Sequence, residues 1–414
     1  MGLAPYGDSS SDKVEKFKRL ILDNLIDLKE DGSLWLNQIY FDYSTGLKMT
    51  NNKRWHELFG FPQRDPESEL LPEHCDMALA IQQVTEEALI RMAHEAKRLT
   101  GASNLCLAGG VALNCVANGK LLKSGIFDNI WIQPAAGDAG GSLGAGLAAY
   151  HIYFGKKRHA DGISDKMNGS YLGPEYSDID ILQTARKFLA KYRRCDTLKD
   201  LCEETATHLA SGNVIGWFQS RMECGPRALG NRSIIADARS PNMQKILNLK
   251  IKYREGFRPF APSVLIEDEQ EFFDISVPSP YMLLVADVQE KRRRPLPEGY
   301  HGMTAREKLY HLRSDVPSIT HIDFSSRLQT VHQETNPHYW QLINEFKQKT
   351  GYGIIVNTSF NVRGEPIVMS PDDAYKCFMR TEMDYLVVGN YIFVKQDQPV
   401  WQESYDWRDE YGLD

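Results

Sequence analysis

The pattern of apolar and polar positions separates a first part in which strands and helices alternate from a second part rich in strands. Between Ala78 and Leu99 apolar residues recur at helical spacing and Gly101 follows, which predicts one long amphipathic helix that ends at this glycine. Two strand–loop–helix units come next, over residues 105–124 and 130–154. Strands that alternate with helices predict an α/β layer here.

The second part begins after a polar stretch at 155–173, which predicts a linker. Helical patterns follow near 179–192 and at 198–210. Apolar strand candidates then lie at 214–218, 233–236, 281–288, 353–356 and 385–394. We therefore predict an α/β protein of two domains, residues 1–165 and 166–414, of which the second is mixed α/β.

Composition narrows the class of protein. The 414 residues are 42% hydrophobic and 25% charged, which is typical of a folding chain with more than one core. The net charge of -7 has the wrong sign for a chain whose main affinity is for nucleic-acid phosphates, so a nucleic-acid partner is disfavoured. The sequence has no apolar run of 18 residues, and its seven scattered cysteines form no Cys-x-x-Cys pair. We expect a cytoplasmic protein without a membrane segment.

Two turns in the first part are candidates for ligand binding. Gly109 and Gly110 stand between a strand and a helix, where backbone N–H groups could approach an anion, or where a tight turn requires a positive φ. Asn114 either caps the following helix or contacts a ligand. Asp138 follows the second strand and either binds a divalent metal or caps the helix that begins at Ala139.

Three segments of the second part concentrate polar and basic side chains. Residues 221–233 contain three arginines and a glutamate between glycines, and residues 252–262 alternate cations with aromatic residues and prolines. Arginine forks match phosphate and carboxylate groups, so the two segments together favour an anion site over a solvated surface. Residues 357–361 end a predicted strand with four hydrogen-bonding side chains, which either contact a purine and ribose or satisfy a tight turn.

With these segments the chain resembles the O-carbamoyltransferases of the nodulation, cephamycin and tobramycin type. The resemblance covers nearly the whole chain through MGLAPYG (1–7), GGVALN (109–114), GDAGG (137–141), GPRALGNRS (225–233), FRPFAP (257–262) and NTSFN (357–361). It implies a partial actin-like ATPase subdomain (Kae1-like, RNase H-like) followed by a YrdC-like mixed α/β domain. It also implies that ATP activates carbamoyl phosphate to carbamoyl-adenylate, and that a hydroxyl group of a small-molecule or sugar acceptor then takes the carbamoyl group.

The same resemblance implies a set of site residues. Those that would hold carbamoyl phosphate and the nucleotide phosphates, as the catalytic set, are Arg227, Arg232, Lys252 and Arg258. Those that would bind the nucleotide or its adenylate are Gly109, Gly110, Asn114, Gly137, Asn357, Ser359 and Asn361. Asp138 would be a ligand of a divalent metal, iron-type or Mg²⁺. The cofactors expected are therefore ATP and this metal.

One departure from the family pattern affects the predicted function. Relatives carry on the order of 100–200 further residues before the MGLAPYG segment, with a His-x-x-x-His metal pair and much of the acceptor pocket. None of the 11 histidines here has a partner four residues away. We therefore expect a truncated chain, or one that works with a separate polypeptide supplying the other half.

Two other functions stay open at this stage. A protein of tRNA threonylcarbamoyl-adenosine biosynthesis would share both domain types, although the acidic charge and the segment at 225–233 weigh against it. A noncatalytic remnant that still binds nucleotide is the third possibility.

Overall fold

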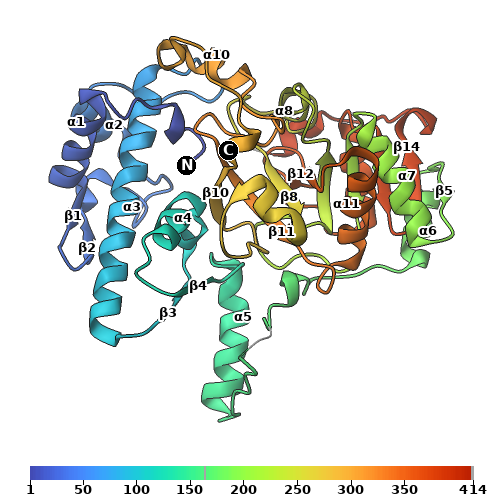
Figure 1. Cartoon of the computed structure of the whole chain (residues 1–414), viewed down its shortest axis with the longest axis horizontal. Helices are drawn as coiled ribbons and strands as arrows, with labels where there is room; N and C mark the ends of the chain where they lie inside the picture. Colours follow the sequence, from blue (N-terminus) through green and yellow to red (C-terminus); the bar gives the residue numbers. More distant parts are fainter. Residues whose placement is uncertain (163–164, 412–414) are drawn as a thin grey trace. The chain divides into compact units, whose positions relative to one another are not determined.

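The structure is a computed structural model that describes residues 1–162 and 165–411 (Figure 1). Its internal contacts divide the chain into two units. The first unit comprises Met1–Leu107 and Asn114–Trp131, and the second comprises Ala108–Leu113 and Ile132–Asp414. Residues 163–164, inside the predicted linker, lie outside the described residues. The domain boundary after residue 165 stays a prediction.

The first unit is built on one long helix, α3 (Pro72–Thr100), which ends as predicted because Gly101 adopts a left-handed φ of 63°. The apolar side of α1 packs against α3 and buries Val14, Phe17 and Val84. The remaining elements of this unit are α1 (Asp12–Leu20), β1 (Ile26–Leu28), β2 (Leu34–Leu36), α2 (Asn52–Phe59), β3 (Asn104–Leu107), α4 (Cys115–Lys123) and β4 (Asn129–Ile132). The expected strand–loop–helix pattern is therefore present.

The second unit contains a ten-stranded mixed sheet in the order β5-β14-β13-β6-β7-β12-β8-β11-β10-β9 (Figure 1). Its strands are β5 (Arg193–Arg194), β6 (Ile215–Phe218), β7 (Arg232–Ala236), β8 (Ala261–Leu265), β9 (Phe273–Asp274), β10 (Leu284–Val288), β11 (Ser325–Val331), β12 (Ile354–Ser359), β13 (Tyr385–Val388) and β14 (Tyr391–Val394). The pairs β6–β13 and β8–β11 are parallel and the other described pairs are antiparallel. The predicted mixed α/β class is confirmed.

Helices α6 (Asp178–Lys187), α7 (Leu198–Ala210), α11 (Pro337–Thr350) and α12 (Pro371–Arg380) bury side chains against the two faces of this sheet. The second unit also contains α5 (Ala139–Ala148), α8 (Met243–Ile246), α9 (Glu269–Phe272) and α10 (Ala305–Tyr310). Figure 1 shows α7 and α11 side by side, and they cover a core that contains Ile235 and Ile355. Because side chains alternate along a strand, Ile354 and Val356 face the opposite core, with residues of α12.

Two expectations about elements need correction. The strand expected at 385–394 is a hairpin, in which β13 and β14 pair antiparallel and Gly389 turns with a φ of 53°. The helix expected to reach Phe154 ends its regular turns at Ala148 and continues as a wider turn over Ala149–Tyr153. No residue of α5 is buried, and Ile152 and Tyr153 are each 82% exposed.

The described residues include no helix that is both long and apolar enough to cross a membrane. All seven cysteines are free thiols.

Candidate functional site

The glycine loop, residues 108–113, lies beside the segment that leads to Gly137. The Gly109 N–H donates to the Ala136 carbonyl at 2.8 Å, and a Cβ built on Gly137 would lie 3.9 Å from Leu113 Cδ1. Gly109 has a φ of 99° and open space at its Cβ position. The glycine is therefore required by backbone conformation rather than by close packing within the chain, which is one of the two explanations left open by the sequence.

Asn114 and Asp138 behave differently at the starts of their helices. Asn114 caps α4 by accepting the Ala117 N–H at 3.2 Å, and it exchanges hydrogen bonds of 3.1 Å with Gln82. Asp138 is exposed and its side chain makes no capping hydrogen bond, so the expectation that it caps α5 is wrong.

Asp138 is also the expected metal ligand. Within residues 1–162 and 165–411, no group of three or more histidine, cysteine, aspartate or glutamate side chains is arranged to hold a metal ion. Asp138 therefore does not fit a metal site with the ligands present here, because catalytic metals in proteins need about three protein ligands. Its assignment as a ligand stays a prediction.

The arginine loop, residues 223–232, connects β6 to β7 and is organised by a buried carboxylate. Glu223 is 5% exposed, and its Oε1 accepts backbone N–H groups from Leu229 at 2.7 Å, Asn231 at 2.8 Å and Arg232 at 3.3 Å. Burial raises the pKa of the Glu223 carboxyl. Sequence reasoning did not assign Glu223 a role, although it noted the glutamate among the arginines.

Side chains from the sheet and the preceding segment bind the carbonyl groups of the same loop. Asn357 Nδ2 donates to the Ala228 carbonyl at 3.1 Å. Gln329 Nε2 and the Tyr171 hydroxyl each donate to the Leu229 carbonyl at 2.8 Å. Asn357 is 1% exposed, so the structure places this predicted nucleotide contact beneath the loop, where its amide group binds backbone.

The two predicted arginines of this loop have different environments. Arg232 is fully buried, and its Nη1 donates to the Gln219 carbonyl at 2.7 Å and the Asn231 carbonyl at 2.9 Å. Burial lowers the pKa of Arg232 to about 10. Arg227 is half-buried, and its Nη2 donates to the Leu113 carbonyl at 3.4 Å, at the end of the glycine loop.

Close packing brings the arginine loop to a third predicted segment. A Cβ built on Gly225 would lie 3.0 Å from the Pro134 carbonyl oxygen, in the segment that leads to Gly137, and Gly225 has a φ of 136°. A larger residue would need both a different backbone conformation and a displaced neighbour. The glycine loop, the segment before Asp138 and the arginine loop therefore meet within the second unit.

Lys252 lies directly after the turn Leu247–Ile251 and reaches the end of β12. Its Nζ donates to Asn361 Oδ1 at 2.7 Å, to the Asn361 carbonyl at 2.8 Å and to Ser359 Oγ at 3.2 Å, and also to the Ser359 carbonyl. The side chain is 2% exposed. Burial, with a contribution from the nearby Arg254 charge, lowers the pKa of Lys252 to about 7. The fold thus brings three predicted site residues into contact, namely Lys252, Ser359 and Asn361.

Arg258, the remaining predicted cation, belongs to a loop that α8 and the turn after it hold in place. Asn248 Nδ2 donates to the Arg258 carbonyl at 3.1 Å, and Arg254 Nε donates to Asn248 Oδ1 at 2.9 Å. The Arg254 guanidinium lies 5.0 Å from the centre of the Phe260 ring. Arg254 was not assigned a role from the sequence, although its position two residues after Lys252 marks it as a neighbour of the site.

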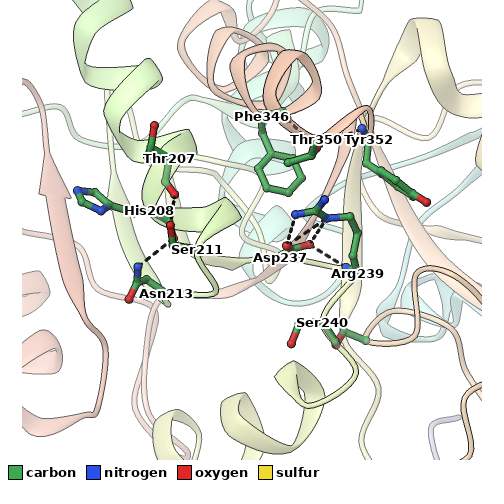
Figure 2. A network of polar contacts seen from close by, with 11 residues as sticks. Thr207, His208, Ser211, Asn213, Asp237, Arg239, Ser240, Phe346, Thr350 and Tyr352 are labelled. Carbon is green, nitrogen blue, oxygen red and sulfur yellow. Dashed lines mark hydrogen bonds and ion pairs between the residues drawn. The ribbon is translucent and has the colours of Figure 1, made fainter.

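A network of polar contacts around Arg239 follows the other end of β7 (Figure 2). Figure 2 shows Arg239 and Asp237 joined by several contacts, of which the Nη2–Oδ2 distance is 2.7 Å. The Arg239 guanidinium also lies 5.3 Å from the centre of the Phe346 ring and 5.6 Å from that of Tyr352. Nearby, Asn213 Nδ2 donates to the His208 carbonyl at 3.0 Å, where α7 ends. The Arg239 contacts join the end of β7 to the C-terminal part of α11, and the Asn213 contact closes the end of α7.

The mixed sheet with buried polar groups at one end places the chain in the α/β class of proteins. Comparison with known families identifies the family. The family model for the carbamoyltransferase N-terminus matches residues 1–147, and that for the carbamoyltransferase C-terminus matches residues 206–395. The chain belongs to the carbamoyltransferase family, which confirms the resemblance seen in the sequence. The glycine loop and Asp138 lie in the first match, and the arginine loop and Lys252 lie in the second.

Individual relatives agree with this assignment. An uncharacterized protein of a Synechocystis species is 54% identical over 100% of this chain and 66% of its own length. Nodulation protein NolO of Bradyrhizobium diazoefficiens is 36% identical over 96% of this chain and 65% of its own length. The 3'-hydroxymethylcephem-O-carbamoyltransferase of Streptomyces clavuligerus is 31% identical over 77% and 54% respectively. The chain aligns with about two thirds or less of the length of these relatives.

Among solved structures, full-length HypF in a phosphate- and nucleotide-bound form aligns with 48% of this chain and 22% of its own, at 14% identity and a TM-score of 0.32. A likeness at this level gives no argument about the fold.

Proposed function

We propose that the chain activates carbamoyl phosphate with ATP and that the carbamoyl group passes to a hydroxyl group of a small-molecule or sugar acceptor. The observation that carries this proposal is the environment of Lys252. Its buried ammonium group contacts four neutral oxygens of Ser359 and Asn361. No carboxylate of the described residues contacts this amine, so an anion would stabilise its charged form, and phosphate groups are the anions of this reaction.

The proposed reaction has three steps. Water attacks carbamoyl phosphate, and carbamate and inorganic phosphate result. A carbamate oxygen attacks the α-phosphorus of ATP, the bond to the β-phosphate bridge breaks, and pyrophosphate leaves. The acceptor hydroxyl oxygen then attacks the carbamoyl carbon of carbamoyl-adenylate, loses its proton and expels AMP. Adenylate is the leaving group that free carbamate lacks.

The residues of the second unit would divide this work. Lys252, Arg227 and Arg258 would neutralise the charge that develops on the departing phosphates. Ser359 and Asn361 would orient the Lys252 ammonium group. We assign Arg232 and Asn357 to the same site as residues that hold the arginine loop, because both donate to backbone carbonyl groups of that region.

The glycine loop would receive the adenylate for transfer, with contacts from Gly109, Gly110, Gly137 and Asn114. This division assigns activation to a YrdC-like domain, residues 166–414, and transfer to a partial Kae1-like domain, residues 1–165. A divalent metal would polarise the carbamoyl oxygen when bound, but the residues described here do not form its site, so no step is derived through it.

We also propose that further polypeptide, in the same protein or in a separate one, completes the transfer site and the acceptor pocket. Two observations support this. The chain aligns with 66% and 65% of the Synechocystis and NolO relatives. The apolar helix α5, at the end of the carbamoyltransferase N-terminus match, has no buried residue. The reaction would take place in the cytoplasm, consistent with the seven free thiols.

The test is pyrophosphate release from ATP by the purified chain, measured with and without carbamoyl phosphate and with no acceptor. Mass spectrometry of the quenched mixture should detect carbamoyl-adenylate. We expect release only when carbamoyl phosphate is present. Tight ATP binding without such release would instead identify a noncatalytic nucleotide-binding protein. Transfer of a threonylcarbamoyl group to tRNA would favour the threonylcarbamoyl-adenosine alternative.

A further inference from the structure

The arginine loop depends on one carboxylate that the proposed mechanism does not use. Glu223 Oε1 accepts three backbone N–H groups of the loop, from Leu229, Asn231 and Arg232. Its other oxygen, Oε2, is buried and accepts no hydrogen bond from the described residues. The hydrogen bonds that this carboxylate accepts from the rest of the chain are therefore directed to the loop backbone.

The loop is held from its other side as well. Asn357 on β12 and Gln329 on β11, the strands on either side of β8, bind the carbonyl groups of Ala228 and Leu229. Both are at most 2% exposed. Donors and acceptors of the same short loop are thus fixed by buried side chains, which leaves its backbone little freedom.

The fixed loop determines where the side chain of Arg227 begins. It lies directly before the fixed stretch 228–232, and its guanidinium reaches the Leu113 carbonyl at the end of the glycine loop. Gly225, on the other side of Arg227, packs closely on the Pro134 carbonyl. A guanidinium that must meet a phosphate in one geometry benefits when its backbone is fixed before the ligand arrives.

We propose that Glu223 is a positioning residue that acts through Arg227: it fixes the backbone of the arginine loop so that the Arg227 guanidinium is held beside the glycine loop, ready for the phosphate of a nucleotide or acyl-adenylate. The inference rests on the proposed function. It deepens that function by giving the two residues separate roles: Glu223 fixes the loop backbone, and Arg227 supplies the positive charge that meets the phosphate.

Three substitutions of Glu223 separate its possible roles. Glu223→Gln keeps an oxygen that accepts the three N–H groups and should retain most of the activity. Glu223→Ala removes the acceptor and should lower the rate of carbamoyl-phosphate-dependent pyrophosphate release by at least about tenfold, as expected for losing hydrogen bonds to a charged group. Glu223→Asp keeps the charge but retracts it, and should give an intermediate rate. It replaces the alanine variant if that variant does not fold.

A double-mutant cycle with Arg227→Ala tests whether Glu223 acts through Arg227. If it does, Glu223→Ala should have little further effect once Arg227 is alanine, because the two substitutions disable one function. Effects that multiply would overturn the proposal, since a purely structural role lowers activity whatever residue stands at 227. The matched control is Glu345→Ala, which removes a carboxylate that is also 5% exposed but binds Gln341 on α11.

A readout other than activity keeps the two proposals distinguishable. Amide hydrogen exchange at Leu229, Asn231 and Arg232 should accelerate in Glu223→Ala and stay slow in Glu223→Gln, with exchange in α7 unchanged. If wild type releases no pyrophosphate, the proposed function fails, and the cycle is then measured as affinity for ATP by calorimetry. Unchanged loop exchange in Glu223→Ala would show that the carboxylate does not fix the loop.

Discussion

The cationic side chains at the two ends of the central sheet have different partners. Ser233 and Ser359 pair at one end, and Ala236 leads into Asp237 at the other. At the Asp237 end, guanidinium groups meet carboxylates. Arg239 binds Asp237 at 2.7 Å (Figure 2), and Arg292 binds Asp315 at 2.7 Å. Their charges are balanced inside the chain.

At the Ser359 end, cations meet neutral oxygens instead. The Lys252 ammonium group contacts the side chains and carbonyls of Ser359 and Asn361, and the Arg232 guanidinium donates to backbone carbonyls. Desolvation of such cations opposes their charged form, as the lowered pKa of both groups shows. The charge of a paired arginine is already balanced, whereas the Lys252 ammonium group among neutral oxygens is prepared for an anionic ligand.

The largest expected effect is that of Lys252→Ala. It should lower carbamoyl-phosphate-dependent pyrophosphate release by about 100-fold or more, because it removes a preorganised charge from the phosphate site. The matched control is Lys250→Ala, which removes an exposed lysine that binds Glu382 at 2.6 Å. Equal activities of the two variants would remove Lys252 from the site.

Arg258→Ala should lower the same rate by about 10- to 100-fold if this arginine holds a phosphate. The backbone at Arg258 is fixed by Asn248, so the loop should keep its position when the side chain is shortened. The thermal unfolding midpoint checks that it does. Wild-type turnover in a folded Arg258→Ala variant would contradict its placement in the phosphate site.

The affinity for phosphate ligands should depend on pH through Lys252. With a pKa of about 7, this group is mostly charged at pH 6 and mostly neutral at pH 8, so binding that requires the ammonium form weakens as pH rises. Calorimetry should show ATP or carbamoyl phosphate bound about tenfold more weakly at pH 8 than at pH 6. Lys252→Gln should abolish this part of the dependence, and an unchanged profile in that variant would assign the titration to another group.

The smallest effect on turnover is expected at the other end of the sheet. Arg239→Ala leaves the buried Asp237 without its arginine and should cost about 1–3 kcal/mol of unfolding free energy, measured by urea denaturation. Pyrophosphate release per folded molecule should stay within about twofold of wild type, because the site lies at the opposite end of β7. A large loss of turnover at unchanged stability would contradict the contrast between the two ends.

Local signals predicted much of the fold. Helix α7 has the bounds that its apolar pattern predicts, and α3 ends at Gly101. The pattern did not indicate β8, because Pro262 near its start is unusual in a central strand. It also did not separate β13 from β14, because only two residues join them. Asn336 as cap and Pro337 in the first turn mark the start of α11, so the sequence holds a signal for this helix as well.

The site was predictable by residue type but not by arrangement. Lys252 and Asn361 are 109 positions apart, and only the sheet brings their side chains to 2.7 Å. Arg232 was expected to hold phosphate because arginine forks match that group and because the family resemblance implies it. In the structure the start of β7 buries its guanidinium among backbone carbonyls, which no local pattern indicates. Asp138 was expected either to cap or to bind metal, and the first of these is wrong.

The most direct test of the contrast is hydrogen exchange of the whole chain, measured alone and with ATP plus carbamoyl phosphate. The account predicts slower exchange at residues 252–258 and 357–361 when the ligands are present, with no change at 237–239 or 346–352. Protection confined to the Asp237 end, or absent from both ends at saturating ligand, would contradict the claim that the cations at the Ser359 end form the phosphate site.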